Sequence, residues 1–117
     1  MTEWKPIPGY EGIYEASNEG AVRSVDRLDS IGRRRKGKVR RQFPVQGGYL
    51  QIRLNKEGVT KGIGVHRLVA LAFIDNPEGK PQVNHINRDV TDNSIENLEW
   101  CTSQENHQHW RELDRAA

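Results

Sequence analysis

The chain of 117 residues contains a single cysteine, Cys101. One thiol cannot form a disulfide within the chain, and it cannot supply the ligands of a cysteine-based zinc ribbon. No apolar run approaches the roughly 18 residues that a membrane-spanning helix needs. The first residues, MTEWKPIPGYEG, lack the basic and apolar regions of a signal peptide. These absences predict a cytoplasmic protein without a membrane partner.

Apolar residues are scarce as well. They make up 34% of the chain, and the mean hydropathy is −0.85. A chain of this length and composition forms one compact domain or two very small ones around a thin core. The formal net charge is only +2, so the chain as a whole is not a polycation.

Positive charge is instead concentrated in one segment, RRRKGKVRR at 33–41, where seven of nine residues are basic. A cluster this dense in a nearly neutral chain favours a polyanionic partner. The alternative is a solvated basic loop without a partner.

Short runs of β-forming residues dominate the first half. The runs 12–16 and 21–25 flank the turn signal SNEG, and together they predict a β-hairpin. The segment 49–54 alternates apolar and polar residues as a half-buried strand does, and 59–65 is expected to return beside it. These elements predict a small antiparallel β module.

The second half carries helix signals near both of its ends. Apolar residues at helical spacing predict a short helix over 66–73. A polar stretch at 84–93 and an apolar–polar alternation at 95–101 follow. Thr102 and Glu105 then form the capping-box signature of a last helix. The order expected for this last unit is strand, long polar loop, strand and helix.

Residues suited to phosphodiester hydrolysis gather in that unit, namely Asn84-His85, Asn93, Asn97 and Asn106. Hydrolysis needs a base that takes a proton from water, and histidine suits this task because its pKa lies near neutrality. It also needs stabilisation of the charge on the phosphate, which a divalent cation with oxygen ligands provides. A histidine beside one asparagine and facing another on a helix can supply both requirements.

Residues 65–106, from VHRLVALAF to CTSQEN, resemble the HNH endonuclease motif of phage and intron-encoded nucleases. The NH pair, the DN before the second strand, and ENLEWCT followed by EN have that family's order and spacing. Residues 3–27 resemble the NUMOD4-like DNA-binding module that often precedes this type of HNH unit. The resemblance implies an α+β fold. A small N-terminal antiparallel β module (1–55, with a basic loop at 33–41) would precede a ββα-metal (His-Me finger) HNH nuclease unit (56–117).

The resemblance implies roles for four residues. His85 would be the general base, and Asn97 would be the central asparagine that braces the loop and orients the histidine. Asn84 and Asn106 would hold one Mg²⁺ or Mn²⁺ ion. Both ligands are neutral amides, which bind a hard cation less tightly than carboxylates do. Asn87-Arg88 stands where the family often has an Asp-Gly pair, so no accessory carboxylate is assigned.

Two further residues are accessory candidates. His109 lies three residues after Asn106 on the same helical face, although a solvated position is preferred for it. Asn93 is the other candidate, and a side chain that closes an Asx turn is its preferred interpretation. His66 is assigned to structure or to a DNA contact rather than to catalysis.

The implied function is metal-dependent hydrolysis of double-stranded DNA that leaves 5′-phosphate and 3′-hydroxyl ends. One site per chain predicts nicking, and a monomer is favoured. The homing and phage origin of such nucleases implies the cytoplasm of a bacterium or of a phage-infected host. The residues expected to contact DNA are basic side chains of the cluster and two arginines beyond it: Arg33, Arg34, Arg35, Lys36, Lys38, Arg40, Arg41, Arg53 and Arg67.

Two alternatives remain open at this stage. The first is a DNA-binding module whose catalysis is weak or lost, because both implied metal ligands are neutral and the loop lacks the usual aspartate. The second is a subunit of a larger phage complex that processes or packages DNA.

Overall fold

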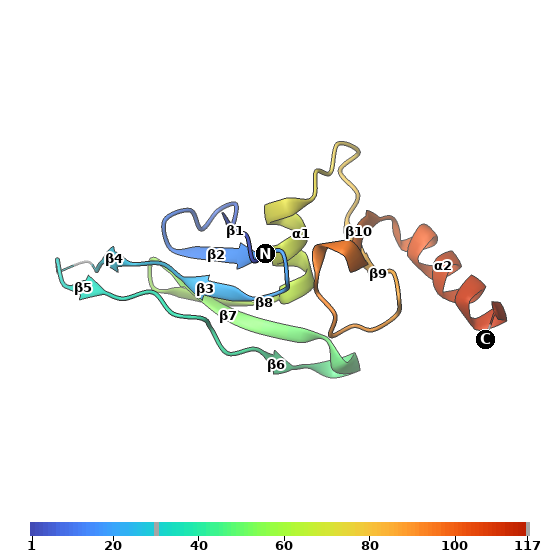
Figure 1. Cartoon of the computed structure of the whole chain (residues 1–117), viewed down its shortest axis with the longest axis horizontal. Coiled ribbons are helices and arrows are strands. Elements are labelled where there is room, and N and C mark those ends of the chain that lie inside the picture. Colours follow the sequence, from blue (N-terminus) through green and yellow to red (C-terminus); the bar gives the residue numbers. More distant parts are fainter. Residues whose placement is uncertain (30, 117) are drawn as a thin grey trace.

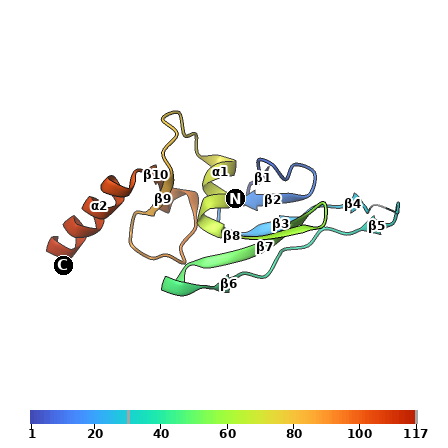
Figure 2. The same ribbon diagram turned by 180° about the vertical axis from the view of Figure 1, so that it is seen from behind.

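The computed structural model describes the backbone of residues 1–29 and 31–116. The molecule is elongated, with extents of 56 × 31 × 29 Å. Antiparallel strands occupy one end and a strand–strand–helix unit the other, with helix α1 (Val65–Phe73) between them (Figures 1 and 2). This arrangement confirms the predicted α+β class. No helix in the described ranges is long and apolar enough to cross a bilayer.

A three-stranded antiparallel sheet, in the order β1-β2-β3, begins the chain. It contains β1 (Trp4–Pro6), β2 (Tyr14–Ser17) and β3 (Val22–Ser24). The β2–β3 hairpin confirms the prediction made from the SNEG turn. Strand β1 was not predicted, because its three residues show no alternation and include a proline, which is confined to sheet edges.

The basic segment is not the loop that the sequence predicted. Strand β5 (Arg34–Arg35) pairs antiparallel with β4 (Arg27–Leu28), and Val39 forms an antiparallel bridge with Arg23. The result is a two-stranded ribbon that projects from the β-rich end of the molecule (Figure 1). Both faces of its strands are exposed. Because no face is buried, no apolar alternation marks these strands in the sequence.

The second three-stranded sheet has the order β6-β7-β8. Its strands are β6 (Phe43–Pro44), β7 (Leu50–Lys56) and β8 (Val59–Gly64), and the β7–β8 hairpin was predicted. Glu57 and Gly58 form its turn with φ of 53° and 78°. Two positive φ values in a two-residue turn match the type I′ geometry that fits the strand twist.

One hydrophobic cluster joins both halves of the molecule. Apolar spacing gives α1 a buried face, and that face packs against the N-terminal sheet, β7 and the C-terminal strands. Position 55/56, at which the sequence divides the two predicted domains, lies within β7, and the core is continuous across it. The division itself stays a prediction. The buried members of the cluster are Ile7, Tyr14, Ala16, Val22, Ile52, Leu54, Val65, Leu68, Val69, Ala70, Val83 and Leu98.

The C-terminal unit has the predicted order of strand, loop, strand and helix. It consists of β9 (Gln82–His85), a 3₁₀ turn (Ile95–Asn97), β10 (Leu98–Cys101) and α2 (Ser103–Ala116). Strands β9 and β10 pair antiparallel.

Helix α2 begins at the predicted capping box. The Thr102 amide donates to Glu105 Oε1 at 2.9 Å, and the Glu105 amide donates to Thr102 Oγ1 at 3.1 Å. These reciprocal bonds satisfy amides that the first turn of a helix leaves without partners.

Candidate active site

His85 ends β9 and is buried, with 1% of the residue exposed. Its Nε2 lies 2.7 Å from Asn93 Oδ1. Because an amide oxygen only accepts hydrogen bonds, Nε2 donates this bond, and Nδ1 is the ring nitrogen that can act as a base. The interpretation of Asn93 as an Asx-turn residue is wrong, since its side chain binds the histidine. The sequence could not distinguish the two, because both uses require the same short amide side chain.

Asn97 ties together the loop that follows His85. Its Oδ1 accepts the Asn87 amide and its Nδ2 donates to the Asp92 carbonyl, both at 2.9 Å. Its own carbonyl accepts the Ile86 amide at 2.9 Å. These bonds hold both ends of the loop 86–94, so Asn97 acts on His85 through the loop. This geometry suits the predicted bracing role.

Asn84 and Asn106 lie on the side of the β9–β10 hairpin that faces α2. Asn106 Nδ2 donates to Gln82 Oε1 at 3.4 Å, and Gln82 shares its face of β9 with Asn84, two residues on. Asn106 Oδ1 is buried and has no hydrogen-bond partner among the residues that the structure describes. A buried oxygen that accepts no hydrogen bond from the protein is suited to binding an ion or a water molecule. The residues therefore fit an oxygen-bound divalent cation.

Glu99 was not predicted as a site residue. It lies on β10 directly opposite Asn84, and its Oε1 accepts a hydrogen bond from Asn84 Nδ2 at 2.9 Å. The carboxylate of Glu99 thus lies beside the neutral amide of Asn84. Only the strand register brings the two residues together, and the sequence carries no signal for that register.

His109 is not a solvated helix residue, as the sequence had favoured. Its Nε2 donates to the Ile86 carbonyl at 2.8 Å, which ties α2 to the residue that follows His85. Its neighbour His107 is exposed and lines an open cavity of about 250 Å³. The other residues that line this cavity are Tyr49, Gln82, Ser103 and Asn106.

Two aromatic side chains contact His85 from outside the strand–strand–helix unit. The ring centroids of His66 and Tyr49 lie 5.1 Å and 5.9 Å from that of His85. Burial, together with smaller electrostatic contributions from His85 and Arg67, lowers the pKa of His66 from 6.5 to about 4. His66 is therefore uncharged near neutral pH. The sequence assigned His66 to structure or DNA contact and gave no role to Tyr49.

Two family models match the chain in succession. A NUMOD4 motif matches residues 3–55, and an HNH endonuclease model matches residues 64–108. The chain therefore contains an HNH endonuclease domain preceded by a NUMOD4 motif. The second match contains His85 and the four asparagines described above.

Relatives of this HNH chain include viral and phage proteins. An uncharacterised HNH endonuclease of Acanthamoeba polyphaga mimivirus, L247, is 42% identical over 91% of this chain and 25% of its own length. The DNA endonuclease I-HmuI of Bacillus phage SP01 is 38% identical over 89% of this chain and 55% of its own length. The HNH chain thus spans about half of the length of I-HmuI and a quarter of the length of the mimivirus protein.

A solved structure has the same fold. The structure described as DNA binding and cleavage by the HNH homing endonuclease I-HmuI superposes with a TM-score of 0.76 at 36% identity. The match covers 97% of this HNH chain and 59% of that chain. The extent of the match shows that both halves of the molecule, and not only the HNH unit, share that architecture.

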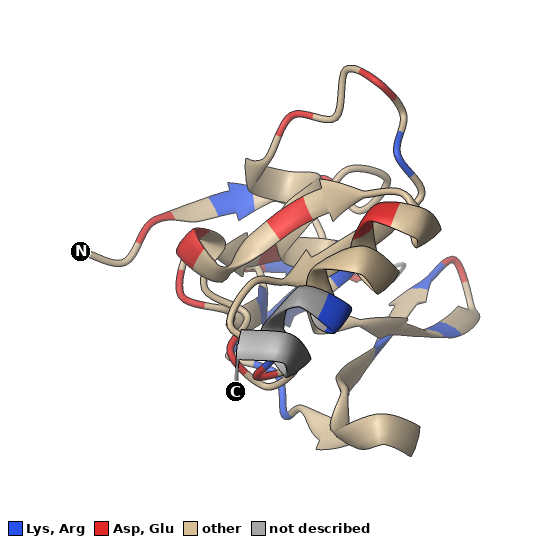
Figure 3. Cartoon of the chain, turned by 90° about the vertical axis from the view of Figure 1, so that its right-hand side faces the viewer, with Lys and Arg blue, Asp and Glu red and all other residues tan. Residues whose placement is uncertain are grey.

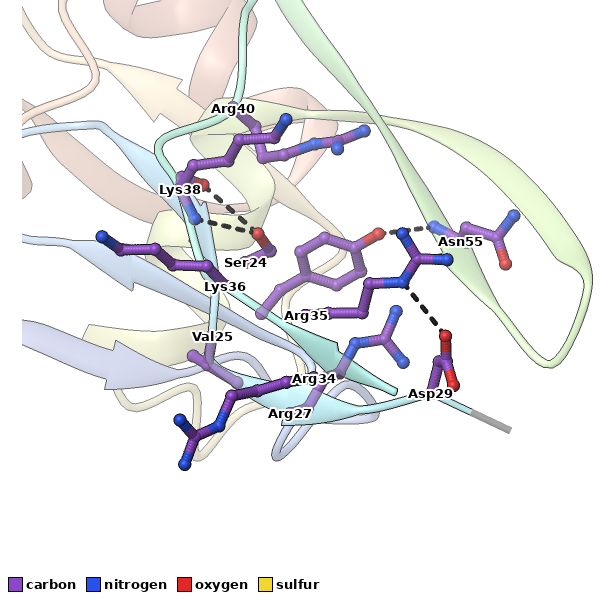
Figure 4. A pocket seen from close by; sticks show the side chains of 11 residues that line it. Ser24, Val25, Arg27, Asp29, Arg34, Arg35, Lys36, Lys38, Arg40 and Asn55 are labelled. Atoms are coloured by element: carbon purple, nitrogen blue, oxygen red, sulfur yellow. Dashed lines mark hydrogen bonds and ion pairs between the residues drawn. The ribbon is translucent and has the colours of Figure 1, made fainter. Parts of the chain in front are cut away.

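Most of the predicted DNA-contacting residues lie on or beside the ribbon. Five of them, from β5 and the chain that follows it, line an open cavity of about 730 Å³ (Figure 4). Asp29 pairs with Arg33 at 3.6 Å and Arg35 at 3.2 Å, so part of the charge is neutralised. The basic residues that line the cavity are Arg27, Arg34, Arg35, Lys36, Lys38 and Arg40.

The remaining predicted contacts lie apart from that cavity. Arg41 is exposed, and Arg53 lies on β7 with its guanidinium 6.0 Å from the Phe43 ring centroid. Arg67 donates to the Pro81 carbonyl at 2.8 Å. Seen from the α2 end, acidic and basic segments are interspersed (Figure 3). The densest group of basic residues lies on the ribbon, toward the opposite end of the molecule (Figure 1).

The β2–β3 turn packs against the loop that carries Asn93. The Ile95 amide donates to the Asn18 carbonyl at 3.0 Å. A Cβ on Gly20 would lie 3.1 Å from the backbone of Asn93, and Gly20 has a φ of 93°. The partner of His85 is thus supported by the N-terminal module.

Gly20→Ala is expected to lower the free energy of unfolding by about 1–3 kcal/mol, because alanine is strained at positive φ, with a further loss from its contact with Asn93. Urea denaturation measures the change. Gly9→Ala is the matched control, because Gly9 has a φ of 87° and nothing lies within 4 Å of the added Cβ. Equal losses in the two variants would show that the contact with Asn93 is unimportant.

Proposed function

We propose that this chain is an endonuclease that hydrolyses phosphodiester bonds of double-stranded DNA with one divalent cation, Mg²⁺ or Mn²⁺. The observation that carries the proposal is the buried His85–Asn93 pair, in which Asn93 holds Nε2 and leaves Nδ1 as the nitrogen that can take a proton. The HNH endonuclease domain and the similarity to a DNA-cleaving homing endonuclease support it.

The chain's own residues have distinct tasks in this reaction. His85 Nδ1 takes a proton from the attacking water, while Asn93 holds Nε2 and so fixes which nitrogen is basic. Asn97 keeps the loop closed behind the histidine. The products are a 5′-phosphate and a 3′-hydroxyl.

Asn84 and Asn106 would hold the cation. When bound, a divalent cation supplies stabilisation of negative charge on the phosphate and on the leaving 3′ oxygen. Glu99 keeps the Asn84 amide oriented and adds the negative charge that the two amides lack. The scissile phosphate itself adds further charge when DNA is bound.

Binding of DNA is assigned to the ribbon, whose basic side chains contact phosphates without reading bases. The chain has one His85 site, so a monomer cuts one strand in each event. Nicked circles are therefore the expected first product from a supercoiled plasmid.

The test uses a supercoiled plasmid library with a long randomised segment, so that no target sequence has to be known. Purified protein is incubated with Mg²⁺, Mn²⁺ or EDTA, and free 3′-hydroxyl ends are mapped by sequencing. Metal-dependent open circles with 5′-phosphate ends are expected. Intact plasmid in every lane together with retained gel-shift binding would favour a DNA-binding module, which the all-amide ligand pair makes the second candidate.

Glu99→Gln is expected to weaken Mn²⁺ binding about 10–100-fold, the usual effect of changing a residue that is hydrogen-bonded to a metal ligand. Glutamine still accepts the hydrogen bond from Asn84, so the variant removes mainly the charge. Adding Asn84→Asp to Glu99→Gln returns a negative charge and should recover the affinity. Isothermal titration calorimetry in the presence of DNA measures it.

Glu96→Gln is the control for this experiment, because Glu96 is an exposed acidic residue of the 3₁₀ turn. Its Mn²⁺ affinity should equal that of the unaltered protein. Unchanged affinity in Glu99→Gln would remove Glu99 from the site.

A further inference from the structure

Three rings from three separate elements meet at His85. Tyr49 directly precedes β7, His66 is the second residue of α1, and His85 ends β9. The Tyr49 and His66 centroids are 5.5 Å apart, which closes a triangle with the two contacts to His85. The interplanar angles of 44° to 55° show that the three rings are tilted against one another.

Gly64 provides the space for this arrangement. A Cβ on Gly64 would lie 2.7 Å from His66 Cε1 and 3.0 Å from His66 Nδ1, both closer than ordinary contact. The φ of Gly64 is −63°, a value that any residue adopts, so its backbone does not require glycine. The absence of a side chain at position 64 thus matters for the His66 ring.

Hydrogen bonds alone do not hold these rings. Asn93 contacts His85 through Nε2, and one bond at the tip of a ring leaves rotation about the bond that carries the ring. His66 Nδ1 is buried without a hydrogen-bond partner among the described residues. Packing of the three rings is therefore what restricts their orientation.

We propose that His66 and Tyr49 are positioning residues that fix the ring of His85 from outside the strand–strand–helix unit. The proposal rests on the proposed function where cleavage is the readout. Because His66 is uncharged near neutral pH, it packs beside His85 without adding a charge. Tyr49 also lines the open cavity beside Asn106, so the same ring borders the face that holds the proposed metal ligands.

The test compares ring removal with ring replacement in the full-length chain. His66→Ala and Tyr49→Ala are expected to lower the single-turnover rate at saturating DNA about 10–100-fold, as a misplaced catalytic group does. DNA affinity should stay unchanged. His66→Phe and Tyr49→Phe keep a ring and should restore the rate, whereas Gly64→Ala should lower it by displacing His66.

Tyr10→Ala serves as the control for lost stability, because Tyr10 packs against Tyr14 rather than near His85. A second readout does not need activity: side-chain NMR of His85 should show broadened ring signals in both alanine variants and sharp ones in the phenylalanine variants. A rate loss equal to that of Tyr10→Ala, or no recovery with phenylalanine, would overturn the proposal. If the unaltered protein does not cut DNA, the proposed function fails, and the NMR comparison still decides the positioning role.

Discussion

His85→Ala is expected to lower the nicking rate about 10²–10⁴-fold, the usual contribution of a general base. Alanine has no group that can accept the proton of the attacking water. The ribbon and the face with Asn84 and Asn106 are untouched, so DNA and Mn²⁺ affinities should remain. Single-turnover nicking with saturating DNA and Mn²⁺ measures the effect separately from binding.

His107→Ala is the matched control for this experiment, because His107 is an exposed histidine of α2 close to Asn106. It should retain the rate of the unaltered protein. Circular dichroism shows whether His85→Ala remains folded, since the variant leaves space in a buried position. Persistent cutting by a folded His85→Ala chain would assign the base to another residue.

Neutralising the ribbon is expected to produce the second large effect, this time on binding. The variant carries Arg34→Gln, Arg35→Gln, Lys36→Gln and Lys38→Gln. Each lost phosphate contact lowers the slope of log affinity against log salt by about 0.9. Affinity at low salt should fall steeply, while the nicking rate at saturating DNA should stay the same. Fluorescence anisotropy across a salt series measures the slope.

Lys80→Gln is the control, because Lys80 is held by Glu105 at 3.1 Å in an ion pair near α2. Its salt slope should match that of the unaltered protein. An unchanged slope in the ribbon variant would place the DNA on another surface. A lost nicking rate at saturation would show that the ribbon also orients the scissile bond.

Elements with a buried face were predictable from the sequence. Strand β7 shows its alternation because Ile52 and Leu54 are buried while Arg53 is exposed. The capping box marks the start of α2 because its bonds are local. The ribbon strands escaped prediction, since neither face is buried and pairing depends on residues several positions away.

The residues of the candidate site likewise fall into those that the sequence could name and those that it could not. His85, Asn97, Asn84 and Asn106 follow a motif with fixed spacing, so their positions could be named from the sequence; their roles stay predictions. The bond of Asn93 to His85 could not be foreseen, because it depends on the path of the loop 86–94. Glu99, His66 and Tyr49 reach the site through strand register and tertiary packing, for which local sequence carries no signal.

The contact of the Ser17–Gly20 turn with the Asn93 loop bears on how such proteins can be recombined. The turn belongs to the N-terminal module, yet the Asn18 carbonyl and Gly20 lie against the segment that orients His85. A chimaera that joins this nuclease unit to a foreign DNA-binding domain would lose that support, together with the Tyr49 ring. Retargeting this scaffold to new DNA sequences therefore calls for redesign of the ribbon surface while the hairpin turn is kept.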